Sequence, residues 1–189
     1  TVGRSDEALF SWYQWVYYTQ FRTGNYSSAT TNFNYWPDYY IGINQCSIFL
    51  KYIDLDKEDT PTTVAYMKAE ARFLRAYYYS LLMSAYGPVF LIGDDPVDFT
   101  QSGLDQRERN TWDECVNYVA NELWEAAKGL PDSWPDIYYG RATKGAALAA
   151  RARLLLYSAR KLFNGNELYK GIVLSLIHIS EPTRRRGIS

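Results

Sequence analysis

The chain has 189 residues, of which 47% are apolar and 22% are charged. This balance is ordinary for a globular domain and excludes a disordered chain. The 20 basic and 21 acidic residues give a formal net charge of -1, which excludes the clustered positive charge of a nucleic-acid-binding protein. Aromatic residues are in surplus, at 17% of the chain. Tyr and Trp join a flat apolar face to a polar group, so they suit helix packing and ligand recognition alike.

The two cysteines, Cys46 and Cys115, are too few and too far apart for a disulfide framework or a zinc site. Each lies on the apolar stripe of a predicted helix, so we expect buried free thiols. No uncharged run is long enough to span a membrane. The chain begins at Thr1 without an initiator methionine or a signal peptide. We therefore interpret it as part of a longer protein.

The N-terminal segment, residues 10–36, interleaves aromatic rings with amide and guanidinium groups. Residues 24–34 are polar and turn-like, so some of these rings flank a loop. Rings beside hydrogen-bonding groups are typical of a recognition surface. The alternative is that Trp12, Trp15 and Trp36 are core residues. The candidate ligand contacts are Trp12, Trp15, Tyr18, Arg22, Asn32, Asn34 and Trp36.

Two helices are predicted in the first half of the chain. Apolar residues three and four positions apart predict one helix over residues 38–53. The second helix has clearer ends, because Thr60-Pro61 is a cap followed by proline in the first turn. Gly87-Pro88 ends it, since proline cannot extend a helix. Its predicted apolar stripe consists of Val64, Met67, Ala71, Leu74, Tyr78, Leu81 and Ala85.

Two further helices are predicted over residues 111–129 and 143–163. Thr111 and Glu114 have the spacing of a capping box. Gly145 and the alanines after it make the last helix narrow at one end, which predicts the close approach of a partner helix. The buried side of the third helix is predicted to comprise Trp112, Val116, Val119, Leu123 and Ala126.

The four helices form two successive hairpins, each apolar along one stripe. This pattern is typical of tetratricopeptide-like pairs that stack into a superhelix, so the predicted fold class is mainly α, with long loops. Residues 87–110 make a long connection, and long loops on rigid scaffolds often carry function. Trp134 and Tyr138-Tyr139, in the loop before the last helix, are a second candidate cluster. Residues 154–157 are expected to face a missing neighbour.

Residues 69–79 read Ala-Glu-Ala-Arg-Phe-Leu-Arg-Ala-Tyr-Tyr-Tyr, and a Gly-Pro-Val turn follows at residues 87–89. This combination resembles the signature helix of the SusD/RagB outer-membrane nutrient-binding proteins. Arg72 and Arg75 lie where a guanidinium stacks on rings and pairs with loop carboxylates, so we expect them to maintain the scaffold. The resemblance extends over residues 36–171 and includes Trp36, Tyr40, Ile43, Asn44, Arg107, Thr111, Leu130-Pro131 and residues 140–147.

The resemblance implies a lipid-anchored protein on the cell surface of the outer membrane. Such proteins pack against a SusC-like TonB-dependent transporter and capture oligosaccharides, or in some members peptides, for import. Family members are more than twice as long as this chain. Residues 1–173 are therefore interpreted as a truncated N-terminal helical region, without the N-terminal lipid anchor. In this family, ligand contacts commonly come from loops of the N-terminal region.

Residues 174–189 resemble the translated read-through of a cloning adapter, and we exclude them from the fold. The alternative is a short strand over residues 172–179 followed by a basic tail. The segment contains His178, which is the only histidine, and the only basic run, Arg184 to Arg186. Neither supports a functional prediction.

Three functions compete for this sequence. Glycan capture is favoured, and a helical-repeat scaffold for protein interactions, or a peptide-binding member of the family, is the alternative. A carbohydrate-active enzyme is disfavoured, because residues 1–173 hold no histidine, nucleophile elbow, phosphate loop or metal-ligand spacing. The adjacent Asp94 and Asp95 do not suit two carboxylates that flank one glycosidic bond. We thus predict no catalytic residues, no metal and no cofactor.

Overall fold

A computed structural model describes residues 23–24, 27, 34–98, 107–164 and 166. The chain divides into two compact units, Thr1–Pro37 and Asp38–Ser189. The described residues form the helices α2 (Trp36–Tyr52), α3 (Pro61–Tyr86), α4 (Trp112–Gly129) and α5 (Lys144–Ser158), with the short 3-10 helices η2 (Ile53–Leu55) and η4 (Asp136–Tyr138). No strand occurs in these ranges. The predicted mainly α fold class is confirmed.

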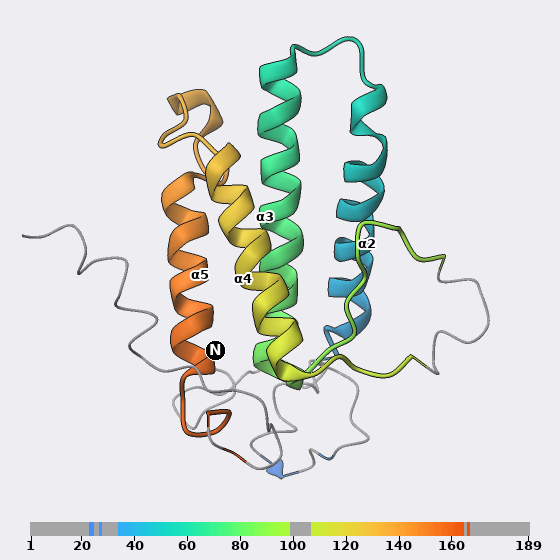
Figure 1. The fold of residues 1–189 in the computed structure, drawn as a ribbon, viewed down its shortest axis with the longest axis vertical. Helices are drawn as coiled ribbons and strands as arrows, with labels where there is room; N and C mark the ends of the chain where they lie inside the picture. Colours follow the sequence, from blue (N-terminus) through green and yellow to red (C-terminus); the bar gives the residue numbers. More distant parts are fainter. Residues whose placement is uncertain (1–22, 25–26, 28–33, 99–106, 165, 167–189) are drawn as a thin grey trace, which may run out of the picture. The chain divides into compact units, whose positions relative to one another are not determined.

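Within the second unit, α4 runs antiparallel to α3 and α5 and packs against both (Figure 1). The predicted starts of these helices are confirmed by their caps. The hydroxyl of Thr60 accepts from Thr63 N at 3.2 Å, and that of Thr143 accepts from Ala146 N at 3.2 Å. Thr111 and Glu114 form the expected capping box. Side-chain acceptors at these positions satisfy backbone N–H groups that have no partner within the helix.

The end of α3 is set by Gly87, as predicted. This residue has φ 73°, a conformation that glycine adopts without the steric penalty of a Cβ, and its N–H bonds to Met83 O at 3.1 Å. The predicted end of α5 is wrong by five residues, because the helix stops at Ser158. The chain then turns, and Phe163 stacks on Trp112 with ring centroids 3.8 Å apart. This ring contact accompanies the burial of Phe163 beyond the end of the helix.

The apolar stripe predicted for α3 is confirmed only in part, because Ala71 is buried, Leu74 and Ala85 are exposed, and the other four residues are half-buried. Leu74 is 42% exposed, whereas its neighbour Arg75 is 0% exposed. The helix is covered from two directions, by α4 and by residues from α2 and the loop after α3, so its buried surface is wider than one stripe. A polar network on the second side draws Arg75 inward. The buried residues of α3 are Ala69, Ala71, Arg75, Ala76, Tyr79, Leu82 and Met83.

The stripe predicted for α4 is confirmed, since all five of its residues are buried. The close helix approach occurs at Gly129, not at Gly145. A Cβ at Gly129 would lie 2.8 Å from Ala69 Cβ, whereas one at Gly145 would meet nothing nearer than Thr143 Oγ1 at 3.9 Å. Gly145 is exposed because it lies in the first turn of α5, ahead of the packed positions. The small side chain that does pack is Ala147, beside Ala69.

Both cysteines are free. Cys115 is buried as predicted, but Cys46 is only half-buried. Burial raises the pKa of both thiols, which keeps them protonated and unreactive at neutral pH. Within the described ranges, no helix combines the length and the apolar character that crossing a membrane requires.

Candidate functional site

Five of the predicted ligand contacts, Trp12, Trp15, Tyr18, Arg22 and Asn32, lie outside the described residues. The other two lie at the start of α2. Asn34 is exposed, and its Oδ1 accepts a hydrogen bond from the backbone N–H of Trp36 at 3.2 Å. Trp36 is half-buried. The observed role of Asn34 is therefore to satisfy a backbone donor at the beginning of the helix.

The loop after α3 is fastened to α2 by side chains spaced one turn apart. The Tyr40 hydroxyl donates to Phe90 O at 2.8 Å, and its ring stacks on the Phe90 ring at 4.1 Å. The Asn44 amide donates to Val97 O at 2.9 Å and accepts from Val97 N at 2.8 Å, much as a neighbouring strand would. These bonds explain why α2 buries polar residues. They make residues 89–97 part of the scaffold.

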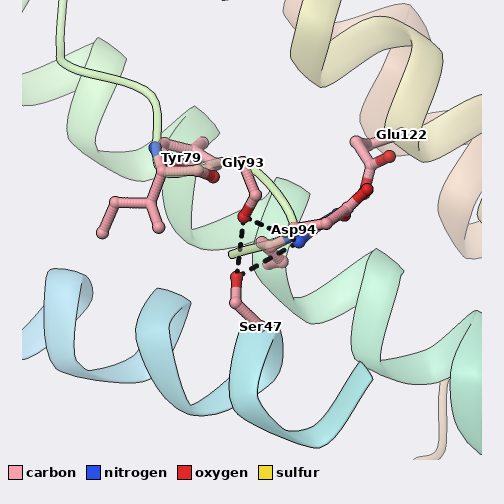
Figure 2. Close-up of polar contacts among 7 residues, drawn as sticks. Ser47, Tyr79, Gly93, Asp94 and Glu122 are labelled. Atoms are coloured by element: carbon pink, nitrogen blue, oxygen red, sulfur yellow. Dashed lines mark hydrogen bonds and ion pairs between the residues drawn. The ribbon is translucent and has the colours of Figure 1, made fainter. Parts of the chain in front are cut away.

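Arg75 of α3 fastens the same loop to α2 and α4. Figure 2 labels its partners Ser47, Gly93, Asp94 and Glu122. Its guanidinium donates to Ser47 Oγ of α2 at 3.1 Å and to Gly93 O at 3.3 Å. It also pairs with Asp94 at 2.9 Å and with Glu122 of α4 at 2.6 Å. The expected pairing of an α3 arginine with a loop carboxylate is confirmed for Arg75.

Burial and pairing act in opposite directions on this arginine. Burial alone would lower the pKa of Arg75, but the hydrogen bond with Glu122 and the other pairing interactions outweigh it, and the pKa is raised. Arg75 thus stays charged inside the fold. Tyr79 adds a neutral link, since its hydroxyl donates to Ile92 O at 3.1 Å and accepts from Ile92 N at 2.6 Å. Most donors and acceptors of this network bind one another, and Arg75 Nε, which has no hydrogen-bond partner, is buried, so the network offers little to a ligand.

The loop between α4 and α5 differs from the loop after α3, because it exposes aromatic rings to solvent. We call residues 131–143 the aromatic turn. Trp134 is fixed by a bond from its Nε1 to Ala142 O at 2.6 Å and by an edge contact with Tyr66 at 5.5 Å. Arg141 lies over the Trp134 ring at 4.1 Å and over the Tyr138 ring at 5.2 Å. Two rings of the predicted cluster therefore lie around one guanidinium.

The carboxylate of Glu70 on α3 holds Arg141 in place. Arg141 Nε donates to Glu70 Oε1 at 2.8 Å, and a second bond joins Arg141 Nη2 to Glu70 Oε2. This hydrogen bonding raises the pKa of Arg141. A two-point fork fixes the orientation of the guanidinium plane, and with it the rings that stack on it. The sequence analysis did not predict the role of Glu70, because no sequence pattern links it to Arg141, which is 71 positions away.

Three side chains of the aromatic turn stay exposed although the turn is fastened. Tyr139 is 95% exposed, Ile137 is 83% exposed and Tyr138 is 47% exposed. Asp132 and Lys144 lie at the base of the turn, 3.8 Å apart. Exposed flat rings accept the apolar C–H face of a pyranose, and nearby charged groups bind its hydroxyls. Within the described ranges, no group of three His, Cys, Asp or Glu residues is placed to hold a metal ion.

Paired helices with a fastened inner loop and exposed rings on an outer turn define a binding module. Residues 1–156 match the family of SusD-like proteins described as "Starch-binding associating with outer membrane". No curated protein is matched by the sequence. The chain belongs to the SusD-like family, whose members are non-catalytic binding proteins associated with the outer membrane.

Several solved structures resemble this one. The structure of BT4246 is 32% identical, covers 85% of this chain and has a TM-score of 0.71. Surface glycan-binding protein A from Bacteroides uniformis is 26% identical, covers 65% of the chain and has a TM-score of 0.57. A structure solved with a xylogluco-oligosaccharide is 25% identical, covers 83% and has a TM-score of 0.61. This chain spans 27%, 27% and 30% of their respective lengths.

Proposed function

We propose that this protein captures oligosaccharides on the outer face of the outer membrane and delivers them to a SusC-like TonB-dependent transporter. An N-terminal lipid anchor holds it at the cell surface. Membership of the SusD-like family supports the location and the class of function. The names of two similar proteins, one a surface glycan-binding protein and one solved with a xylogluco-oligosaccharide, favour a glycan over a peptide as the ligand.

The observation that carries the proposal is the aromatic turn, whose rings remain exposed although its backbone is fixed. Lys144 N donates to Pro131 O at 2.9 Å, which joins the two ends of the turn. Arg141 N donates to Tyr138 O at 3.2 Å, which closes a smaller turn within it. The Tyr138 ring lies near the Arg141 guanidinium and edge-on to the Trp134 ring, so it loses little conformational freedom when a sugar stacks on it. Tyr139 and Tyr138 are the stacking residues in this proposal, and Asp132 and Lys144 bind hydroxyls.

The N-terminal residues Trp12, Trp15, Tyr18, Arg22, Asn32, Asn34 and Trp36 are proposed as a second set of contacts. Their rings and guanidinium have counterparts in the aromatic turn, and they add side-chain amides. The contribution of each set to glycan binding is tested separately, by substituting a residue of one set while the other set stays intact.

Isothermal titration against a panel of plant, host and storage glycans tests the proposal. We expect at least one glycan to bind and Tyr139→Ala to weaken it at least about tenfold, or about 1.4 kcal/mol. Trp12→Ala tests the N-terminal contacts in the same way. The matched control is Tyr52→Ala, because Tyr52 is an exposed tyrosine at the end of α2, outside the aromatic turn. Binding of a peptide and of no glycan would reject the proposal in favour of a peptide-binding member of the family.

A further inference from the structure

A tryptophan and two cations lie together where α4 packs against α5. Trp124 of α4 is 44% exposed. The guanidinium carbon of Arg151, which belongs to α5, lies 5.4 Å from the centroid of the Trp124 ring, and Lys128 Nζ lies 5.7 Å from the same centroid. The two helices contact each other directly. Two helices, and not a loop, therefore set the positions of these side chains, and sites built on helices hold their geometry well.

The guanidinium of Arg151 is fixed at one end and open at the other. Its Nε donates to Ala120 O of α4 at 3.2 Å. Its two Nη groups form no hydrogen bond or ion pair with any residue that the structure describes. An arginine that is already oriented loses little freedom when its terminal N–H groups bind an anion.

The aromatic turn contains a similar pair that is complete. There the Arg141 guanidinium lies 4.1 Å from the centroid of the Trp134 ring, and it binds the Glu70 carboxylate at two points. The protein itself supplies that carboxylate, and Trp134 is only half-buried rather than exposed. At Arg151 the described part of the chain supplies no carboxylate. The free Nη groups are therefore in a position to bind one that a ligand brings.

The charges on this surface also favour an anion. Lys128 pairs with Glu125 at 2.6 Å, so the positive charge of Arg151 is the one that stays unbalanced among these side chains. In the aromatic turn and at its base, by contrast, Arg141 and Lys144 are each paired with a carboxylate. The two surfaces differ in their available charge, and we expect them to bind different ligands.

We propose that Trp124 and Arg151 form a second glycan-binding site, which takes a sugar that carries a carboxylate, such as a hexuronate. The apolar C–H face of the sugar covers the exposed indole, and the Nη groups of Arg151 bind the carboxylate. In a hexuronate the carboxylate is attached directly to the sugar ring, so a stacked ring brings it beside the guanidinium. An exposed indole next to the fork favours a sugar over an acidic peptide, and this choice rests on the proposed function.

An NMR titration of the 189-residue chain with tetragalacturonate tests the site. The indole Nε1–H signal of Trp124, assigned by its loss in Trp124→Phe, should shift until it saturates. The methyl ester of the same oligosaccharide keeps the sugar rings but has no charge. It should bind at least about tenfold more weakly, because the charge-assisted hydrogen bonds are lost. Binding of tetragalacturonate should also weaken in about 1 M NaCl.

Variants of Arg151 separate its charge from its geometry. Arg151→Gln should weaken binding of tetragalacturonate at least about tenfold. Arg151→Lys keeps the charge but loses the two-point fork, so its affinity should lie between those of Arg151→Gln and the native protein. The matched control is Arg153→Gln, because Arg153 is an exposed arginine of α5 that lies two positions further on and therefore on another face of the helix. This control should bind as tightly as the native protein.

Three results would overturn the proposal. The absence of a saturating shift at Trp124 would show that the site takes no uronate. Equal affinity for the methyl ester, or for Arg151→Gln, would show that the guanidinium does not bind the carboxylate. Tetraglutamate that binds at Trp124 as tightly as tetragalacturonate would assign the site to an acidic peptide.

The aromatic turn is tested apart from the Trp124 site. Tyr139→Ala should leave the shift of the Trp124 signal by tetragalacturonate unchanged, because Tyr139 belongs to the aromatic turn. If glycans of the panel bind while tetragalacturonate does not shift the Trp124 signal, the Trp124 site alone is rejected. If neither the panel nor tetragalacturonate binds, the proposed glycan capture is rejected as well.

Discussion

Arg75 and Arg141 occupy similar surroundings in two regions of the molecule. Arg75 of α3 pairs with Glu122 of α4, and Arg141 of the aromatic turn pairs with Glu70 of α3. Each arginine also lies near aromatic residues. Arg75 is fully buried and binds the backbone of a loop, so its contacts hold the fold together. Arg141 lies under rings of a turn that faces solvent. The sequence around an arginine therefore does not distinguish the scaffold from the proposed recognition surface, whereas the exposure of the neighbouring side chains does.

The largest expected effect comes from Arg75→Met. The change leaves Glu122 charged and mostly buried without its cation, and it removes a donor from Ser47. Breaking one partner of a buried pair lowers the free energy of unfolding by about 3–5 kcal/mol. Urea denaturation followed by circular dichroism measures this loss. Arg72→Met is the matched control, one turn earlier on α3. Arg72 has no ion pair among the described residues, so we expect a loss below about 1 kcal/mol.

The double variant Arg75→Met with Glu122→Leu sharpens this result. It removes both buried charges, and the remaining carboxylate, Asp94, is exposed to water. Apolar replacement of a whole buried pair is often neutral or stabilising, so the double variant should recover most of the loss. A double variant as unstable as Arg75→Met alone would show that the hydrogen bonds to the loop matter more than the charge pair.

The second effect in size comes from Tyr79→Phe. The change leaves Ile92 N–H and C=O without the partners that the hydroxyl supplies inside the fold. We expect the free energy of unfolding to fall by about 2 kcal/mol. Hydrogen exchange should show faster opening of residues 89–97 than of α4. Tyr78→Phe is the control on the same helix, because Tyr78 is only half-buried. Equal losses in the two variants would contradict the assigned role of Tyr79.

The sequence predicted the starts of α3, α4 and α5 and the end of α3 well, because a cap is a local feature. Thr60, Thr111, Thr143 and Gly87 each act within one turn of their own position. The buried side of α3 was not predictable in the same way. It depends on α2 and on the loop that Tyr40, Asn44 and Ser47 bind, and these contacts join residues about 50 positions apart.

The candidate site was predictable only in part. Trp134, Tyr138 and Tyr139 stand close together in a loop, which marked them as a cluster. Glu70 holds Arg141, on which Trp134 and Tyr138 stack, but it lies on another helix, and a glutamate in the middle of a helix has no distinctive pattern. Hydropathy also does not show that Tyr139 is exposed while Tyr79 is buried. That difference arises from tertiary packing alone.

A smaller effect on stability, with a clear effect on binding, is expected of Glu70→Gln. The change removes one charge from the fork that holds Arg141, while the side chain keeps its length. We expect the free energy of unfolding to fall by about 1 kcal/mol, because the pair is partly exposed. Affinity for the glycan should fall at least about threefold, since the rings lose their fixed position. Glu125→Gln is the control, because Glu125 pairs with Lys128 away from the aromatic turn. Unchanged affinity would show that Arg141 only braces the loop, as Arg75 does.

The smallest effect on stability is expected of Tyr118→Phe, in the buried region around Arg75 and Tyr79. The Tyr118 hydroxyl is buried and forms no hydrogen bond, and its ring packs edge-on against Tyr79. Its removal should raise the free energy of unfolding by about 0.5 kcal/mol at neutral pH, because an unsatisfied group is lost.

The same substitution changes the response to alkali. Burial raises the pKa of Tyr118 from its ordinary 10.0 to about 12. Between these values the unfolded chain has released the proton while the folded chain still holds it, so stability falls as the pH rises through this window. A phenylalanine at this position has no proton to release, and the variant should therefore lose less stability than the native protein between about pH 10 and pH 12. Urea midpoints at about pH 8, 10 and 11.5 measure the difference. The control is Tyr52→Phe, at an exposed position, which should leave the pH dependence of the native protein unchanged. Parallel curves of urea midpoint against pH for all three proteins would mean that Tyr118 is hydrated in the folded state.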